Sequence, residues 1–238
     1  CALARNKQIA VYLGIMERAP DRGGHTLYAS LVYINANGDI CSVHRKLQPT
    51  FEERLVWGAG DGHGLRVHDL GAFRTGGLNC WENWLPLARA ALYGQGADLH
   101  ISVWPGGQHN TADLPRFIAM ESRSYVIAAS GLMRASDISA AVPYAAEIRA
   151  ASGEFLANGA SAIAAPDGSW LIEPVIGEEV LLVAELDHAL VRRERHNLDI
   201  VGHYSRPDVT RLQVNRRRQS TLLLDDSDAD TADDTRDT

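Results

Sequence analysis

The sequence predicts a mixed α/β sandwich built as one large domain. Between Phe73 and Ser130, strand-like and helix-like segments alternate and form two consecutive strand–helix–strand units. On either side of this region, strand-like segments are joined by hairpin turns. Because strand–helix–strand units produce parallel strands and hairpins produce antiparallel ones, the two patterns together predict a mixed sheet covered by helices. A chain of 238 residues with 45% hydrophobic residues suits a single core of this kind.

The amino-terminal part predicts three strands followed by a long loop. Residues 1–5 resemble the last turn of a helix, and the polar turn 18–24 and the hairpin signal Asn35–Gly38 separate runs rich in Val, Ile and Tyr. The loop 46–64 contains Pro49 and four glycines, and long ordered loops are often functional. The strands predicted here are 8–16, 26–34 and 39–44.

The remaining segments alternate between strand and helix patterns up to about residue 196. Short runs rich in Val, Ile and Leu predict strands, whereas longer runs with apolar residues three or four positions apart predict helices. Asp167 and Gly168 supply a hairpin turn. The predicted strands are 65–70, 73–79, 98–104, 125–130, 160–165, 169–173 and 180–186, and the predicted helices are 83–93, 114–122, 144–151 and 189–196.

Charge and composition argue against several classes of function. Residues 225–238 hold seven Asp and one Arg, which is −6 of the net charge of −7, so the rest of the chain is near neutral. Five arginines lie between residues 206 and 218, but a neutral body without interleaved aromatic residues argues against a nucleic-acid partner. No apolar run is long enough to span a bilayer, so we expect no membrane partner. We predict a domain over residues 1–218 and an acidic, disordered tail over 219–238.

The three cysteines, Cys1, Cys41 and Cys80, are too few and too odd in number for a disulfide framework. Together with the absence of a signal-peptide pattern at the start of the given sequence, they predict a reducing, cytoplasmic compartment.

Cys80 is the first candidate for a catalytic residue. It follows the glycine-rich strand that ends at Asn79, and a predicted helix comes directly after it. The positive end of a helix dipole next to a thiol favours the thiolate, which is the nucleophilic form. The alternative interpretation is a small buried hydrophobic residue, which is what most isolated cysteines are.

Two further segments with unusual residues also follow predicted strands. Lys46 comes after the strand 39–44, and Trp104 ends the strand 98–104. Lys46 is notable because only it and Lys7 are lysines among the 23 Lys and Arg residues. Since the carboxyl ends of strands in an α/β sheet meet at one edge, we predict that Lys46, Cys80 and Trp104 converge.

Three motifs in these segments resemble the nitrilase branch of the nitrilase superfamily of carbon–nitrogen hydrolases. The run HRKLQPTFEERLVWGAGDG is similar to the lysine motif of that branch, and GGLNCWENWLPLARAAL is similar to its cysteine motif. The segment Leu198–Asp208 resembles its carboxyl-terminal signature. The resemblance extends from about residue 8 to residue 218. It implies an α-β-β-α sandwich that hydrolyses a small nitrile to a carboxylic acid and ammonia, and that assembles into dimers or larger spirals.

The resemblance also implies roles for individual residues. Cys80 matches the nucleophile and Lys46 the catalytic lysine, and neither a metal nor a cofactor is implied. Glu53 matches an assisting glutamate, although the adjacent Glu52 is an alternative. Trp81 and Trp104, together with Trp84, are candidates for an apolar wall that binds the substrate side chain. The alternative for the tryptophans is ordinary core packing.

One part of the family pattern has no match. The family places its general-base glutamate in an early strand, in a motif like Phe-Pro-Glu, and nothing in residues 1–45 corresponds to it. Glu17 is the single glutamate there, and it precedes a polar turn. We therefore expect the given sequence to be a fragment that lacks the first strand, one or two helices and this glutamate, and to have impaired activity.

Other functions of the same superfamily stay open at this stage. An amidase, a carbamoylase or a cyanide hydrolase would use the same type of site. Cys-Trp-Glu together with Arg-Lys-Leu-x-Pro-Thr favours nitriles. A non-enzymatic alternative is an inactive scaffold, which applies if the given sequence is the complete natural protein.

Overall fold

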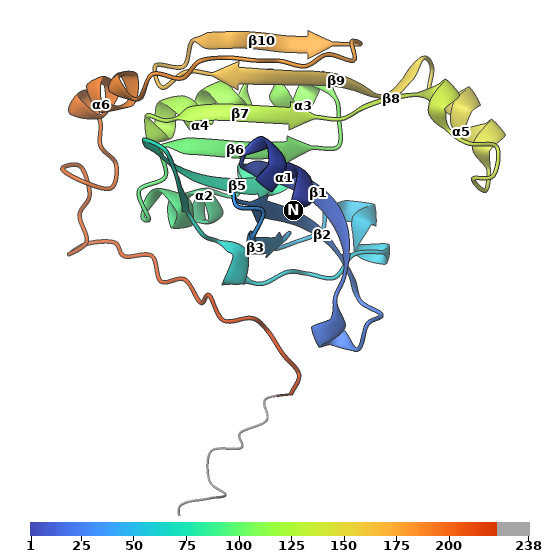
Figure 1. Cartoon of the computed structure of the whole chain (residues 1–238), viewed down its shortest axis with the longest axis horizontal. Coiled ribbons are helices and arrows are strands. Elements are labelled where there is room, and N and C mark those ends of the chain that lie inside the picture. The colour runs from blue at the N-terminus through green and yellow to red at the C-terminus, as the bar shows by residue number, and fades with distance from the viewer. Residues whose placement is uncertain (223–238) are drawn as a thin grey trace, which may run out of the picture.

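The structure is a computed structural model that describes residues 1–222, and it contains two β-sheets that pack on each other (Figure 1). The smaller sheet has the order β1-β2-β3 and is antiparallel throughout. The larger sheet has the order β10-β9-β7-β6-β5-β4, and β8 pairs with β9 beside it. The strands are β1 (Val11–Arg18), β2 (Leu27–Ile34), β3 (Ile40–Arg45), β4 (His68–Leu70), β5 (Phe73–Asn79), β6 (Leu99–Trp104), β7 (Tyr125–Ser130), β8 (Leu132–Arg134), β9 (Phe155–Ala164) and β10 (Trp170–Ile176).

The centre of the larger sheet consists of the two predicted strand–helix–strand units. β5, β6 and β7 are parallel neighbours, whereas β4, β9 and β10 pair antiparallel to their neighbours. This confirms the predicted mixed α/β fold. The helices are α1 (Ala2–Lys7), α2 (Pro86–Tyr93), α3 (Gln108–Thr111), α4 (Leu114–Ser122), α5 (Ala145–Ala151) and α6 (His188–Asn197).

Helices cover the outer faces of the two sheets. On the smaller sheet, Ala4 of α1 packs with Val32 and Ile34 of β2. On the larger sheet, Leu92 of α2 packs with Leu78 of β5, and α4 packs against β7. The inner faces meet each other, as shown by the bond from the Tyr12 hydroxyl to the Thr75 carbonyl (3.1 Å). The layers are therefore helix, sheet, sheet and helix.

Several details differ from the prediction, and three of them have a clear physical reason. Residues 180–186 are not a strand, because they have no ladder partner and Leu181 and Val183 point into solvent. β9 begins at Phe155 rather than 160, because β8 and β10 both supply partners to residues that have little strand propensity of their own. The predicted helix 83–93 is replaced by a short 3₁₀ helix at Cys80–Trp84 followed by α2, since Pro86 starts a new helix.

The predicted tail 219–238 lies mostly outside the described residues, and its described part, 219–222, is exposed, although the Gln219 N–H still donates to the Asp61 carboxylate (2.9 Å). The domain boundary at 218 stays a prediction. Within residues 1–222, none of the helices combines the length and apolar character needed to cross a membrane.

Candidate active site

The site lies where a strand of each sheet ends. β3 of the smaller sheet ends at Arg45, so Lys46 is the first residue after it, and β5 of the larger sheet ends at Asn79, directly before Cys80. The Glu82 carboxylate accepts the backbone N–H of Leu47, the residue after Lys46 (2.7 Å), and that of Asn79, the residue before Cys80 (2.9 Å), so the two strand ends lie close together. The predicted convergence of Lys46 and Cys80 is thus present in the structure, and it joins two sheets rather than neighbouring strands of one.

Cys80 occupies a sharp turn with a left-handed backbone, at φ 53°. For a residue other than glycine this conformation costs about 1–3 kcal/mol, so surrounding bonds must hold it. The Asn83 side chain supplies them by donating to the carbonyls of Cys80 (2.8 Å) and Leu78 (3.2 Å). Asn79 and Glu82 form a capping box around the same turn. The nucleophile candidate is therefore held rigidly.

The pKa of the Cys80 thiol is raised, first because burial disfavours the thiolate. The Lys46 ammonium and a backbone hydrogen bond with Trp81 lower the pKa, while Glu53 and Glu82 raise it. We expected the dipole of a following helix to lower the pKa of Cys80, but the pKa is raised instead. Cys80 lies in a short 3₁₀ helix, and the α-helix α2 begins only at Pro86. Burial therefore favours the protonated thiol over the thiolate, and the thiol must lose its proton to act as a nucleophile.

Lys46 is buried, and its ammonium group has two partners. Nζ donates to the Glu53 carboxylate (2.5 Å) and to the Thr50 hydroxyl (3.1 Å). Glu53 also accepts the backbone N–H of Thr50 (2.8 Å), which fixes the carboxylate in place. Glu52 is exposed. The geometry therefore makes Glu53, and not Glu52, the partner of Lys46, while the catalytic roles of both residues stay predictions.

Glycines in the long loop allow it to pack closely against the Lys46 backbone. The Gly60 N–H donates to the Lys46 carbonyl (2.8 Å), and a Cβ at Gly60 would lie 2.2 Å from the Arg45 carbonyl oxygen. A Cβ at Gly62 would lie 2.2 Å from the carbonyl oxygen of Asn215, in the carboxyl-terminal segment. No side chain fits at either position, and the loop is held between β3 and the carboxyl-terminal segment.

Arg218 fastens that carboxyl-terminal segment to the loop. Its guanidinium donates to the buried carboxylate of Asp61 (3.1 Å) and to the Val43 carbonyl (3.1 Å). Asp61 also accepts the backbone N–H groups of His63 and Gln219. A segment far along the chain thus helps to hold the loop that contacts Lys46.

We expect Arg218→Ala to lower the free energy of unfolding by about 1–3 kcal/mol, because it leaves the buried Asp61 carboxylate without its charged partner. Denaturant unfolding followed by circular dichroism measures this. Arg206→Ala is the matched control, since Arg206 pairs with Asp208 in full exposure to solvent, and it should leave the unfolding midpoint unchanged. Equal effects of the two variants would contradict a structural role for Arg218.

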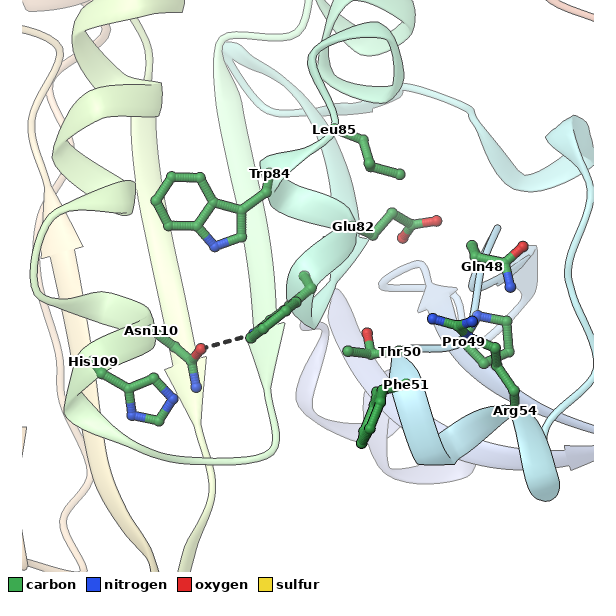
Figure 2. A pocket seen from close by; sticks show the side chains of 11 residues that line it. Gln48, Pro49, Thr50, Phe51, Arg54, Glu82, Trp84, Leu85, His109 and Asn110 are labelled. Carbon is green, nitrogen blue, oxygen red and sulfur yellow. Dashed lines mark hydrogen bonds between the residues drawn. The ribbon is translucent and has the colours of Figure 1, made fainter.

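A largely apolar pocket of about 860 Å³ adjoins this site. Phe51, Trp84 and Leu85 provide apolar walls, and Asn110 and His109 lie across from Phe51 (Figure 2). Trp81 lines it as well, half exposed, with its indole N–H donating to the Asn110 side-chain oxygen (3.1 Å). Trp81 therefore lies on the wall of the pocket, and its contact with a substrate stays a prediction.

Trp104 does not line this pocket. It is buried, its indole N–H donates to the Ser102 hydroxyl (3.0 Å), and it packs in the same core cluster as Cys80 and Ile118. The reason is that β6 is a central strand covered on both faces. The structure places Trp84 on the pocket wall and Trp104 in the core, so Trp104 supports the turn of Cys80 rather than facing the pocket.

Several polar residues at the site had no predicted role. Glu82 and His44 form a buried pair (2.9 Å), and Asn83 pairs with His100 (2.7 Å). Burial lowers the pKa of His100 to about 4, so its imidazole is neutral and serves the hydrogen-bond network. The spacing Asn79-x-x-Glu82 is the capping-box signature, and it is the signal from which Glu82 was predictable.

Comparisons with known proteins agree on the family. The carbon–nitrogen hydrolase family model matches residues 1–196. A curated relative, nitrilase 2 from an unknown prokaryotic organism, is 36% identical over 231 residues, which cover 97% of this chain and 71% of the relative. An aliphatic nitrilase from Rhodococcus rhodochrous is 33% identical over 243 residues, covering 96% of this chain and 61% of the relative.

Solved structures show the same fold. Nit3 of Saccharomyces cerevisiae, a member of branch 10 of the nitrilase superfamily, has a TM-score of 0.67 at 20% identity, and the match covers 85% of this chain and 69% of that one. The chain therefore spans 61–71% of the length of these proteins. The predicted nitrilase-like fold and the resemblance on which it rested are confirmed.

Proposed function

The chain belongs to the carbon–nitrogen hydrolase family, and from that premise we propose that it hydrolyses a small nitrile to a carboxylic acid and ammonia. The observation that carries the proposal is the meeting of Cys80 with the Lys46–Glu53 pair beside an apolar pocket. A thiol supplies a nucleophile, a buried ammonium supplies positive charge and a proton, and aromatic walls hold an aryl, arylaliphatic or aliphatic side chain.

In the first step the Cys80 sulfur attacks the nitrile carbon. A carbon–sulfur bond forms, one π bond of the C≡N group breaks, and negative charge develops on nitrogen. Lys46 stabilises this charge and donates a proton to it, and Glu53 accepts the thiol proton or restores the proton of Lys46. The contact between Lys46 and Glu53 supports both roles. The product is a thioimidate.

Water completes the reaction in two further steps. One water molecule adds to the thioimidate, and ammonia leaves, which gives a thioester. A second water molecule releases the carboxylic acid and frees Cys80. The family assigns activation of water to the glutamate that has no match in residues 1–45, so we expect overall turnover by this chain to be slower by about 10²–10⁴-fold than with that base present.

Two accompanying proposals follow from the sequence. The sparse cysteines favour action in the cytoplasm, and the family resemblance favours self-association into dimers or larger spirals.

A panel of nitriles and amides tests the reaction class. We expect ammonia release, or a covalent adduct on Cys80 with the mass of the nitrile, from at least one aryl, arylacetic or aliphatic nitrile. Matching amides should react more slowly. The thiol only has to add to the linear C≡N group of a nitrile, whereas an amide must also expel its amine as a leaving group. Ammonia assays and intact-protein mass spectrometry measure both. Reaction with an amide and with no nitrile would make the protein an amidase instead.

A further inference from the structure

The carboxylate of Glu82 is completely enclosed beside the two catalytic candidates. Its side chain is 0% exposed, and it accepts three hydrogen bonds. Oε1 accepts the Leu47 N–H (2.7 Å), and Oε2 accepts the Asn79 N–H (2.9 Å) and bonds His44 Nε2 (2.9 Å). An enclosed charge is costly unless several donors compensate it, and here each oxygen has at least one.

The partners of Glu82 belong to both sheets. Leu47 follows Lys46 and His44 lies in β3, whereas Asn79 precedes Cys80 at the end of β5. β3 and β5 share no backbone ladder, because β3 pairs with β2 and β5 pairs with β4 and β6. In Figure 2 the Glu82 carboxyl group points from its own turn toward the segment with Gln48 and Pro49. One carboxylate therefore spans the gap between the two strand ends.

We propose that Glu82 is a positioning residue that fixes the distance between Lys46 and Cys80 by binding the backbone next to each of them. The proposal rests on the function proposed above. Glu82 itself has no contact with a substrate in this role, and it acts through its two neighbours. Small displacements of such groups are expensive, since a shift of about 1 Å can cost about 10²-fold in rate.

A carboxylate is required at this position by the chemistry of its partners. Backbone N–H groups are donors only, so the Leu47 and Asn79 groups both need an acceptor. The second nitrogen of His44, Nδ1, is buried without a partner in the described part of the chain, so Nε2 carries the proton and is a donor as well. A glutamine at position 82 would set its NH₂ group, itself a donor, against one of these N–H donors.

The charge of Glu82 works against the thiolate, which separates positioning from electrostatic activation. Its negative charge raises the pKa of Cys80, whereas the Lys46 ammonium lowers it. If Glu82 only supplied charge, its removal would lower the thiol pKa. If Glu82 holds Lys46 near Cys80, its loss raises the thiol pKa, because the ammonium moves away.

Glu82→Asp keeps the charge and shortens the side chain by one methylene, so it cannot bridge Leu47 and Asn79. We expect the pH midpoint of Cys80 alkylation by iodoacetamide to move upward, and nitrile adduct formation to slow by about 10²-fold. Peptide mass spectrometry separates Cys80 from the exposed Cys41, whose alkylation in the same sample is an internal reference. An unchanged or lowered midpoint in folded protein would overturn the proposal.

Glu82→Gln is the second variant and keeps nearly the original volume. Loss of charge alone predicts a lower pH midpoint of Cys80 alkylation, and loss of positioning predicts a higher one. The direction of the shift therefore distinguishes the two roles of Glu82 in this variant also. Alkylation needs no nitrile. If wild-type protein forms no nitrile adduct, the proposed function fails while the alkylation midpoints still test the role of Glu82.

Asp98→Asn is the matched control for Glu82→Gln. Asp98 is a buried carboxylate that accepts the backbone N–H of Arg74 (2.6 Å) and bonds an imidazole nitrogen of His188 (2.8 Å). It lies directly before β6, at the amino-terminal end of the strands, whereas the candidate site lies at their carboxyl-terminal ends. The Asp98→Asn variant should lose about as much stability as Glu82→Gln and leave the pH midpoint of Cys80 alkylation unchanged. An equal shift in this control would mean that general loosening, and not positioning, changes the thiol.

Discussion

Cys80→Ala is expected to form no covalent adduct with any nitrile and to release no ammonia above the solvent background. Alanine removes the sulfur that forms the bond to carbon, and loss of a nucleophile costs about 10⁴-fold or more. The fold should persist, because the turn is held by Asn83 and by the capping box rather than by the thiol. Intact-protein mass spectrometry after incubation with nitrile checks the adduct, and an ammonia assay checks turnover.

Cys41→Ala is the control for this experiment. Cys41 is exposed on β3, and its thiol bonds only the Asp39 carbonyl of the neighbouring turn. The variant should form adducts as wild type does. Adduct formation that persists in Cys80→Ala and disappears in Cys41→Ala would move the reaction to a different thiol and refute the proposed site.

Lys46→Ala is expected to slow adduct formation by about 10²–10³-fold, the loss typical of a group that stabilises developing charge. It should also shift Cys80 alkylation to higher pH. The sign follows from the site: Lys46 lowers the pKa of a thiol that burial has already raised, so removal of the ammonium raises that pKa further. At a fixed neutral pH, less thiolate is then available.

Lys7→Ala is the matched control, since it changes the one other lysine of the chain, which is exposed in α1. It should leave both the adduct rate and the alkylation midpoint unchanged. A Lys46→Ala variant that reacts at the wild-type rate with an unshifted midpoint would show that the ammonium has no part in the chemistry.

Local pattern was sufficient for most of the fold. The alternation of strand and helix patterns from β5 to β7 predicted parallel neighbours, and turn signals such as Asn35–Gly38 predicted antiparallel ones. The predictions failed where neighbouring strands, rather than local sequence, decide whether a segment forms a strand. Residues 180–186 have strand-like composition but no strand beside them, whereas β9 runs through small residues because it has partners on both sides.

The same division applies to the site. Motifs of consecutive residues predicted Cys80, Lys46 and Glu53 as site candidates, because each of these side chains is placed by the turn or strand end on which it lies. Thr50 and Glu53 meet within one loop, so their contact with Lys46 also follows from short spacing. Trp104 shows the limit of such reasoning, since its place at a strand end did not reveal that the strand is covered on both faces.

What the consecutive residues determined about this protein is therefore its family, most of its sheet-forming segments and the candidates for its reactive groups. Tertiary structure alone decided that Lys46 and Cys80 come from different sheets, that burial raises the pKa of the thiol, and that Glu82 connects the two strand ends. The physical reason is that burial and bonds between distant segments depend on how whole sheets pack, whereas turns, caps and strand patterns depend on a few neighbouring residues.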